Sequence, residues 1–275
     1  MSAAMRANSC PFVVKIRPMK RSRLPALATL LVLVFLHAPL VVLVGNSFNA
    51  SRFGGEWEGF TWQWYERLWQ ADDIWDSLWL TLKLALGSTL LATVLGTLSA
   101  WALHHFSSRL QRLHRGLMLL PLMMPEVLMG MALLSLFTAL GVQTGMMTLW
   151  AAHVTFCVSY VAMVVLGRLR GFDPHLLEAA RDLGASPWQA ARRVVLPLLL
   201  PGILAGALLA FTLSLDDFVI SFFVSGPGST TLPLRIASMM KTSRSLPVIN
   251  ALSTLLISAT FLFATLAFRL NRARS

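Results

Sequence analysis

The sequence lacks the motifs of the common catalytic sites. Its two cysteines, Cys10 and Cys157, are too far apart to suggest a disulfide framework or a pair of metal ligands. It contains no Gly-Lys dipeptide, which a phosphate-binding P-loop requires, no Gly-x-Ser-x-Gly nucleophile elbow and no His-Glu-x-x-His zinc motif. The sequence therefore predicts no catalytic residue, no metal site and no cofactor. If the protein depends on ATP, another polypeptide must hydrolyse it.

Charge is also scarce, and its scarcity indicates a membrane protein. Only 13% of the 275 residues are charged, whereas 56% are hydrophobic, and the mean hydropathy is +0.67. A helix needs about 20 apolar residues to cross the hydrocarbon core of a bilayer. Six such runs are present, at about 24–45, 78–103, 117–140, 146–167, 198–222 and 247–268. We predict an all-α membrane protein in which residues 24–268 form one domain of six transmembrane helices.

The net charge of +11 could suggest nucleic acid, but the distribution of the basic residues indicates membrane topology instead. When six spans are threaded, seventeen of the 23 Lys and Arg residues fall on one side. They lie in the tail 1–23, in the connections 104–115 and 168–193, and in the tail 269–275. Because basic residues accumulate on the cytoplasmic side, both termini and both connections are predicted to be cytoplasmic. No nucleic-acid partner is predicted.

The connection 168–193 contains two short helices that meet at a glycine. Asp173 is a suitable N-cap and Pro174 suits the first helical position. The helix that follows is amphipathic, and Gly184 suits the left-handed residue that ends it. Ser186 and Gln189 have capping-box spacing for a second helix. The apolar face of the first helix comprises Leu176, Leu177, Ala180 and Leu183, and its polar face Glu178, Arg181 and Asp182.

This segment resembles the EAA loop of binding-protein-dependent ABC importer permeases. The matching positions are Glu178-Ala179-Ala180, Gly184, Val194 and Leu196-Pro197, with valine where the family usually has isoleucine. An amphipathic helix lying among lipid headgroups would share the periodicity, but it would explain neither the glycine spacing nor the Leu-Pro. The resemblance implies a type I importer permease fold with cytoplasmic coupling helices. The coupling loop 174–197 would then dock on an ATPase subunit through residues 176–184.

Other stretches resemble the permeases of putrescine and spermidine importers, in particular the putrescine permease that pairs with a second permease. They are Pro125-Glu126-Val127, 152–161, 210–217, and 225–228 followed by Thr231-Leu232-Pro233. The resemblance implies import of polyamines across a bacterial inner membrane. It also implies a second permease, two ATP-binding subunits and a periplasmic solute-binding protein as partners. Two alternatives are import of another solute, such as an opine, an aminophosphonate or an iron chelate, and proton-coupled secondary transport.

Three carboxylates inside or near apolar spans are candidates for a substrate pathway. Pro121 and Pro125 are expected to break the helix of the third span. Glu126 follows Pro125 and would lie near the middle of this span, where an uncompensated charge is costly. Asp216 and Asp217 would lie near the outer end of the fifth span. They could line a path for a cationic amine, or they could extend toward the headgroups. His37 and His153 are predicted to be buried imidazoles with hydrogen-bond partners.

The loop 46–76 combines acidic residues with five tryptophans, Trp57, Trp62, Trp64, Trp69 and Trp75. Tryptophans beside a membrane span usually belong to an aromatic belt at the headgroups, and this is the first interpretation. A contact face for a soluble binding protein and a cap over a substrate pathway are the alternatives, and the acidity of the loop would suit a basic docking surface or a cationic ligand.

Overall fold

The computed structural model describes residues 24–52, 56–171, 173, 175–241 and 246–272. These residues form helices and contain no β-strand, in agreement with the predicted all-α class. The predicted tail 1–23 lies outside the described residues. The elements are α1 (Leu24–Asn46), α2 (Gln63–Trp69), α3 (Asp72–His105), α4 (Arg109–Met123), α5 (Glu126–Ala139), α6 (Met146–Arg170), α7 (His175–Asp182), α8 (Pro187–Ala190), the π-helical turn η1 (Ala191–Val195), α9 (Leu196–Asp216), α10 (Val219–Val224), α11 (Leu232–Met240) and α12 (Leu246–Arg272).

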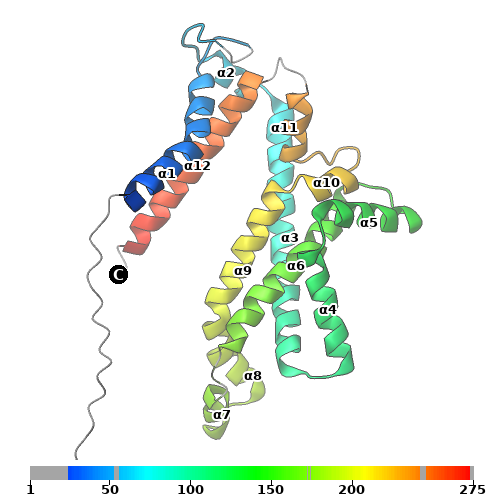
Figure 1. Ribbon diagram of the computed structural model, residues 1–275. Coiled ribbons are helices and arrows are strands. Elements are labelled where there is room, and N and C mark those ends of the chain that lie inside the picture. Colours follow the sequence, from blue (N-terminus) through cyan, green and yellow to red (C-terminus); the bar gives the residue numbers. More distant parts are fainter. Residues whose placement is uncertain (1–23, 53–55, 172, 174, 242–245, 273–275) are drawn as a thin grey trace, which may run out of the picture.

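The core of the protein is the contact between α3, α6 and α9, which cross one another in Figure 1. Small residues allow these helices to approach closely. A Cβ added at Gly96 of α3 would lie 2.7 Å from Cβ of the fully buried Val161 of α6. A Cβ added at Gly206 of α9 would lie 3.3 Å from Cγ1 of the same valine. The side chain of Val161 therefore fills the space that these two glycines leave open.

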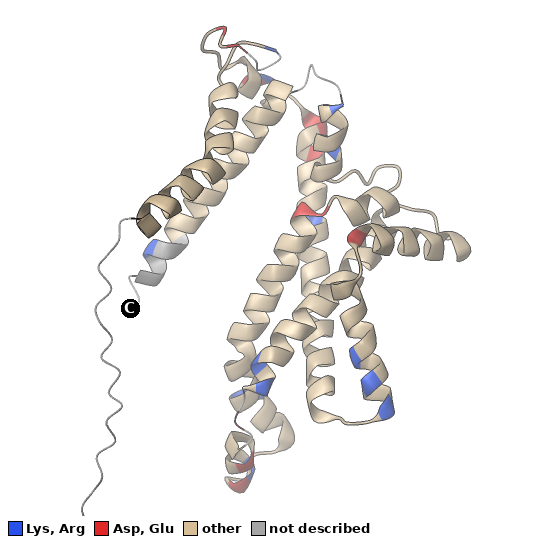
Figure 2. Cartoon of the chain, in the orientation of Figure 1, with Lys and Arg blue, Asp and Glu red and all other residues tan. Residues whose placement is uncertain are grey.

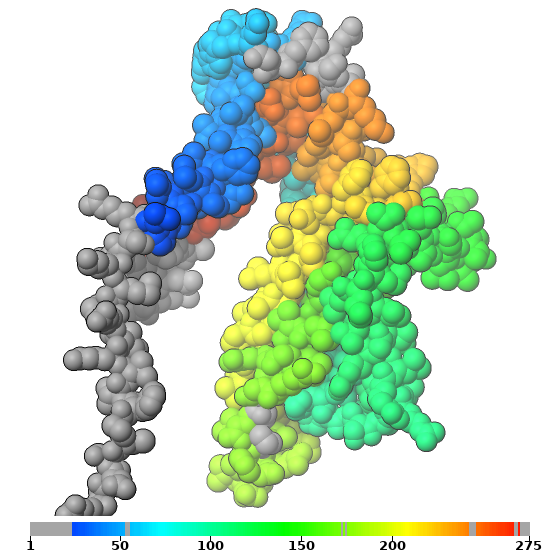
Figure 3. All heavy atoms as spheres, viewed as in Figure 1, coloured from blue at the N-terminus to red at the C-terminus, as the bar shows by residue number. Residues whose placement is uncertain are grey.

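A second, smaller unit consists of α1 and α12, which pack against each other (Figure 1). It is joined to the rest through α2, which contacts α12, and through α11, which contacts both α12 and α3. The space-filling view in Figure 3 shows a wide opening between this pair and α9. No residue of α1 is buried, and the first buried residue after it is Ser47.

The predicted third span, 117–140, is broken as expected, although only one of its two prolines breaks it, because Pro121 lies inside α4. The span is divided into α4 and α5, and the chain bends by 117° between them. Pro125 has no amide hydrogen to continue a helix and restricts the residue before it, and Met124 is extended with ψ 137°. The helix also begins earlier than predicted, because Ser108 caps it by accepting a hydrogen bond from the amide of Gln111. Among the described residues, five helices are long and apolar enough to span a membrane, and the bent pair makes a sixth span if it counts as one.

The predicted fifth span, 198–222, also differs from the structure. The helix starts earlier, because α8, η1 and α9 run on as one helical rod from Pro187 to Asp216. It ends earlier too, because Asp217 is extended with ψ 120° and α10 begins only at Val219. The apolar composition of the run 198–222 concealed this break, which depends on side chains from other helices.

Candidate functional site

The first candidate region is α7, the first helix of the predicted coupling loop. Its start follows the predicted capping: the carboxylate of Asp173 accepts a hydrogen bond from the amide of His175 at 3.0 Å. Pro174, predicted at the first helical position, lies outside the described residues. At the other end Gly184 has φ +82°, the left-handed conformation that was predicted. The amide of Ala185 donates to the carbonyl of Ala180 and that of Gly184 to Arg181, which together form a Schellman motif.

The two faces of α7 differ in what they contact. Leu177 and Ala180 are partly buried, and Leu177 packs against the core of the chain. Leu176 and Leu183 are 45% and 89% exposed, so the predicted apolar face is divided between the protein's own core and solvent. The charged residues of the segment, Glu178, Arg181 and Asp182, are all exposed, and Ala179 is exposed beside them. Oε2 of Glu178 lies 3.2 Å from Nδ1 of its neighbour His175.

The second helix, α8, connects this exposed region to the core. Its predicted capping box is present: the amide of Gln189 donates to Oγ of Ser186, and the amide of Ser186 donates to Oε1 of Gln189. The helix then passes through the π-helical turn η1, in which the amide of Leu196 donates to the carbonyl of Ala191. No loop separates α8, η1 and α9, which form one continuous helix from Pro187 to Asp216. π-turns of this kind are frequent at functional sites.

The second candidate region is a buried polar cluster at the break between α9 and α10. The side chain of Asp217 is 4% exposed, and its Oδ2 lies 3.4 Å from Nε2 of His153 on α6. The carboxylate also accepts hydrogen bonds from the amides of Ile220 and Ser221, at 3.2 and 2.8 Å. Asp217 therefore caps the first turn of α10. We call Asp217, His153, Ser88, Ser214 and Ser221 the polar junction.

His153 is fully buried and connects three helices within the polar junction. Its Nδ1 lies 2.7 Å from Oγ of Ser214 on α9, and its Nε2 lies 3.1 Å from Oγ of Ser221 on α10. Ser214 in turn shares a hydrogen bond with Ser88 on α3, at 2.9 Å. The prediction that His153 is buried and hydrogen-bonded is confirmed. Its pairing with Asp217 was not predicted, because no local pattern links residues that are 64 positions apart.

The other two predicted pathway carboxylates, Asp216 and Glu126, are exposed in the chain. Asp216 is the last residue of α9, directly before the break, and Glu126 is the first residue of α5, directly after the break between α4 and α5. The two breaks lie on helices that pack together, because Gly130 of α5 fits against the ring of Phe223 of α10. Figure 2 shows how few other charges lie in this part of the molecule. The structure thus separates Asp217, which has protein partners, from Asp216 and Glu126, which are free to contact other groups.

Two further predictions need correction. His37 is exposed on α1, although Nδ1 has a partner in the carbonyl of Leu33 at 2.8 Å. Trp64 is not part of an aromatic belt, because it is fully buried under α12 and donates its Nε1 hydrogen to the carbonyl of Asn49 at 2.7 Å. Trp57, Trp62 and Trp69 are 57–75% exposed. Within the described residues no group of three His, Cys, Asp or Glu side chains could hold a metal ion.

Comparisons with known proteins agree with this architecture. Residues 92–273 match the family model described as the binding-protein-dependent transport system inner membrane component. The chain is 42% identical to the spermidine/putrescine transport system permease protein PotC of Haemophilus influenzae over 241 residues, which cover 88% of this chain and 93% of that protein. It is 42% identical to the putrescine transport system permease protein PotI of Escherichia coli K12 over 260 residues, which cover 92% of each chain.

A solved structure shows the same fold. It is a crystal structure of a bacterial ABC transporter involved in the import of the acidic polysaccharide alginate, and it matches 92% of this chain and 99% of its own with a TM-score of 0.72 at 14% identity. This likeness concerns the fold alone. The multi-pass helical architecture, the match to the family model and the two permeases lead to one conclusion: the chain belongs to the binding-protein-dependent transport system inner membrane components, the permease subunits of ABC importers.

Proposed function

We propose that this chain is the polyamine-importing permease of such a system, carrying putrescine or spermidine into the cytoplasm. The observation that carries the substrate class is the 42% identity, over about nine tenths of the chain, to two permeases named for these amines. The exposed carboxylates Asp216 and Glu126 support it, since a cation that leaves water needs a compensating negative charge. Import of an opine, an aminophosphonate or an iron chelate is the competing proposal. Proton-coupled secondary transport does not agree with the family.

The partners follow from the surfaces that the chain leaves uncovered. Two cytoplasmic ATP-binding subunits would supply the energy, and one would receive α7, with Leu176 and Leu183 entering its cleft and Glu178 and Arg181 at its rim. A second permease would cover α1 and fill the opening between α1 and α9 in Figure 3. A periplasmic solute-binding protein would dock on the loop 46–62, which exposes Trp57 and Trp62. This orientation places both termini and α7 in the cytoplasm, as the distribution of basic residues indicates.

The mechanism we propose uses the continuity of α8, η1 and α9. Closure of the ATPase pair would displace α7 and α8, and the rigid connection would tilt α9 together with the core helices. Because the break at Asp217 follows directly, α9 can move relative to α10 by a change in a few backbone angles. Such a movement exposes a central path to one side of the membrane at a time.

The test is uptake of labelled putrescine and spermidine by cells that lack the gene for this chain. Reintroducing the chain should restore uptake, and the Glu178→Arg variant should restore less than a tenth of it while inserting normally in the membrane. Gln143→Arg, an exposed change between α5 and α6, serves as a control with one added positive charge and should transport normally. If the deletion leaves amine uptake unchanged, the substrate is another solute. If Glu178→Arg transports normally, the proposed role of Glu178 is wrong.

A further inference from the structure

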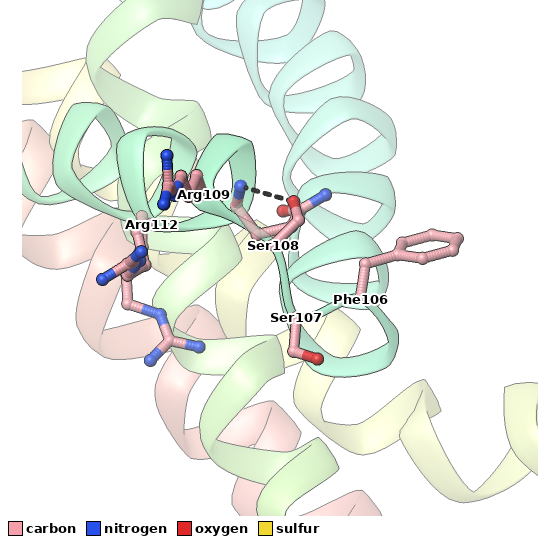
Figure 4. A pocket seen from close by; sticks show the side chains of 7 residues that line it. Phe106, Ser107, Ser108, Arg109 and Arg112 are labelled. Carbon is pink, nitrogen blue, oxygen red and sulfur yellow. Dashed lines mark hydrogen bonds between the residues drawn. The ribbon is translucent and has the colours of Figure 1, made fainter.

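A basic hollow lies at the junction of α3 and α4, and its residues belong to neither of the two regions described above. It encloses about 430 Å³ and is lined by Phe106, Ser107, Ser108, Arg109, Gln111, Arg112 and Arg115 (Figure 4). It lies at the same end of the molecule as α7 and α8 (Figure 1), which is the predicted cytoplasmic end. We call this site the arginine pocket.

The charge of the arginine pocket is entirely positive. Its three guanidinium groups come from one stripe of α4, at spacings of three residues, and Figure 2 shows the basic residues of α4 in a row with no acidic residue on that helix. Among the described residues no carboxylate forms an ion pair with any of the three. In the described part of the chain, the three guanidinium groups donate one hydrogen bond, a long one of 3.5 Å from Arg115 to the carbonyl of Leu103.

The start of α4 adds to this positive field. The first-turn amides of a helix have no intrahelical acceptor, and the helix dipole places partial positive charge at this end. The Ser108 hydroxyl accepts from the amide of Gln111, which leaves its own hydrogen free to donate, and Ser107 is exposed beside it. Guanidinium groups, hydroxyls and helix amides together are the donors that phosphate oxygens accept from.

The surroundings of the pocket indicate that the phosphate belongs to a lipid. On α4 the arginines alternate with Leu110, Leu113 and Leu117, which are 70%, 60% and 52% exposed, and Phe106 at the pocket is 61% exposed. A soluble anion would not contact this apolar surface. A phospholipid carries its acyl chains next to its phosphate, so it can contact the leucines and the arginines together. Membrane topology alone requires only that positive charge lie on this side, and it does not require three guanidiniums at one hollow.

We propose that the arginine pocket binds the headgroup phosphate of an anionic phospholipid in the cytoplasmic leaflet, with the acyl chains lying along the leucines of α4. Basic pockets beside transmembrane helices on the cytoplasmic side commonly take anionic headgroups. The bound lipid would fix the α3–α4 connection at the membrane surface, next to the helices that receive the movement of the ATPase. This site depends on the proposed orientation of the chain but not on the identity of the transported solute.

The test uses the assembled transporter in nanodiscs of phosphatidylcholine with or without phosphatidylglycerol, and counts retained phosphatidylglycerol by native mass spectrometry. The variant Arg109→Gln/Arg112→Gln/Arg115→Gln should bind phosphatidylglycerol on the order of a hundredfold more weakly, at about fivefold per arginine. The matched control Arg269→Gln/Arg272→Gln/Arg274→Gln removes the same charge at the same predicted side and should bind it as the wild type does. Equal binding by the pocket variant, or equal loss in the control, would overturn the proposal.

Two further arms separate other ligands from a lipid. Inorganic phosphate and glycerol 3-phosphate are added as competitors, and displacement of phosphatidylglycerol at low concentration would mean that the pocket binds a free phosphate. If the pocket variant keeps its lipid but loses the ATPase subunits, the pocket is a protein contact and the lipid site is wrong. If the triple variant fails to assemble, the single variant Arg112→Gln is used instead. It should bind phosphatidylglycerol about fivefold more weakly than the wild type. An unchanged affinity for phosphatidylglycerol would contradict the proposal. None of these outcomes bears on amine uptake, so the substrate proposal is tested separately.

Discussion

The helices α6 and α7 are neighbours in sequence but opposites in packing. In α6, 13 of the 25 residues are buried, and the helix packs against α3 and α9. In α7 no residue is buried, although its apolar and charged residues separate onto two faces. The difference shows that one chain can contain a helix that is buried in its own core and a helix that leaves large apolar side chains, Leu176 and Leu183, exposed. Changes in α6 and its partners should therefore affect folding, and changes in α7 should affect transport alone.

The largest effect is expected from Gly96→Leu, which tests the core. The new side chain would collide with Val161, whose Cβ lies 2.7 Å from the position of the first added carbon, and with the backbone of Ala162. Overpacking of this kind costs about 1–3 kcal/mol or more. The folded protein recovered from membranes should fall severalfold, and its thermal unfolding midpoint should drop. Gly167→Leu in α6, where nothing lies within 4 Å, is the control and should unfold near the wild-type temperature.

The variants Asp217→Asn and Asp216→Asn compare a buried and an exposed carboxylate at adjacent positions. Asp217→Asn removes one of two buried oxygens that accept from backbone amides and weakens the contact with His153, so we expect a loss of about 1–3 kcal/mol in the free energy of unfolding. Asp216→Asn changes an exposed group and should cost no more than about 0.5 kcal/mol. Denaturation of the purified subunit measures both. Equal losses would mean that the polar junction does not support the fold.

The smallest effect on stability is expected at Gly184, in the exposed segment. Gly184→Ala places a Cβ on a residue with φ +82°, at a cost of about 1–2 kcal/mol that falls on the end of α7 rather than on the core. The unfolding midpoint should stay unchanged while amine uptake falls severalfold. Gly184→Asn is the matched control, because asparagine tolerates this conformation, and it should transport better than the alanine variant. A lower unfolding midpoint together with normal uptake would mean that Gly184 supports the fold and not transport.

How much could be predicted from the sequence depended on how local the cause was. The caps of α7 and α8 and the left-handed Gly184 follow from residues within four positions, and all were predicted. The bend at Met124 and Pro125 was indicated by proline, although its angle was not. The break at Asp217 was missed, because the carboxylate there is held by His153 on α6 and by amides that become available only when the helix stops. Burial of Trp64 and exposure of His37 likewise depend on where α12 lies.

The most direct measurement is thiol labelling of a Leu183→Cys variant in which Cys10 is replaced by serine, with and without the ATPase subunits. Leu183 is 89% exposed in this chain, so the isolated permease should react rapidly, while the buried Cys157 should react slowly. Gln143→Cys, exposed before the start of α6 and thus at the opposite end of that helix from α7, is the control and should react equally in both samples. Our account predicts at least tenfold slower labelling of residue 183 when the ATPase subunits are bound. Equal labelling in both samples would contradict docking through α7.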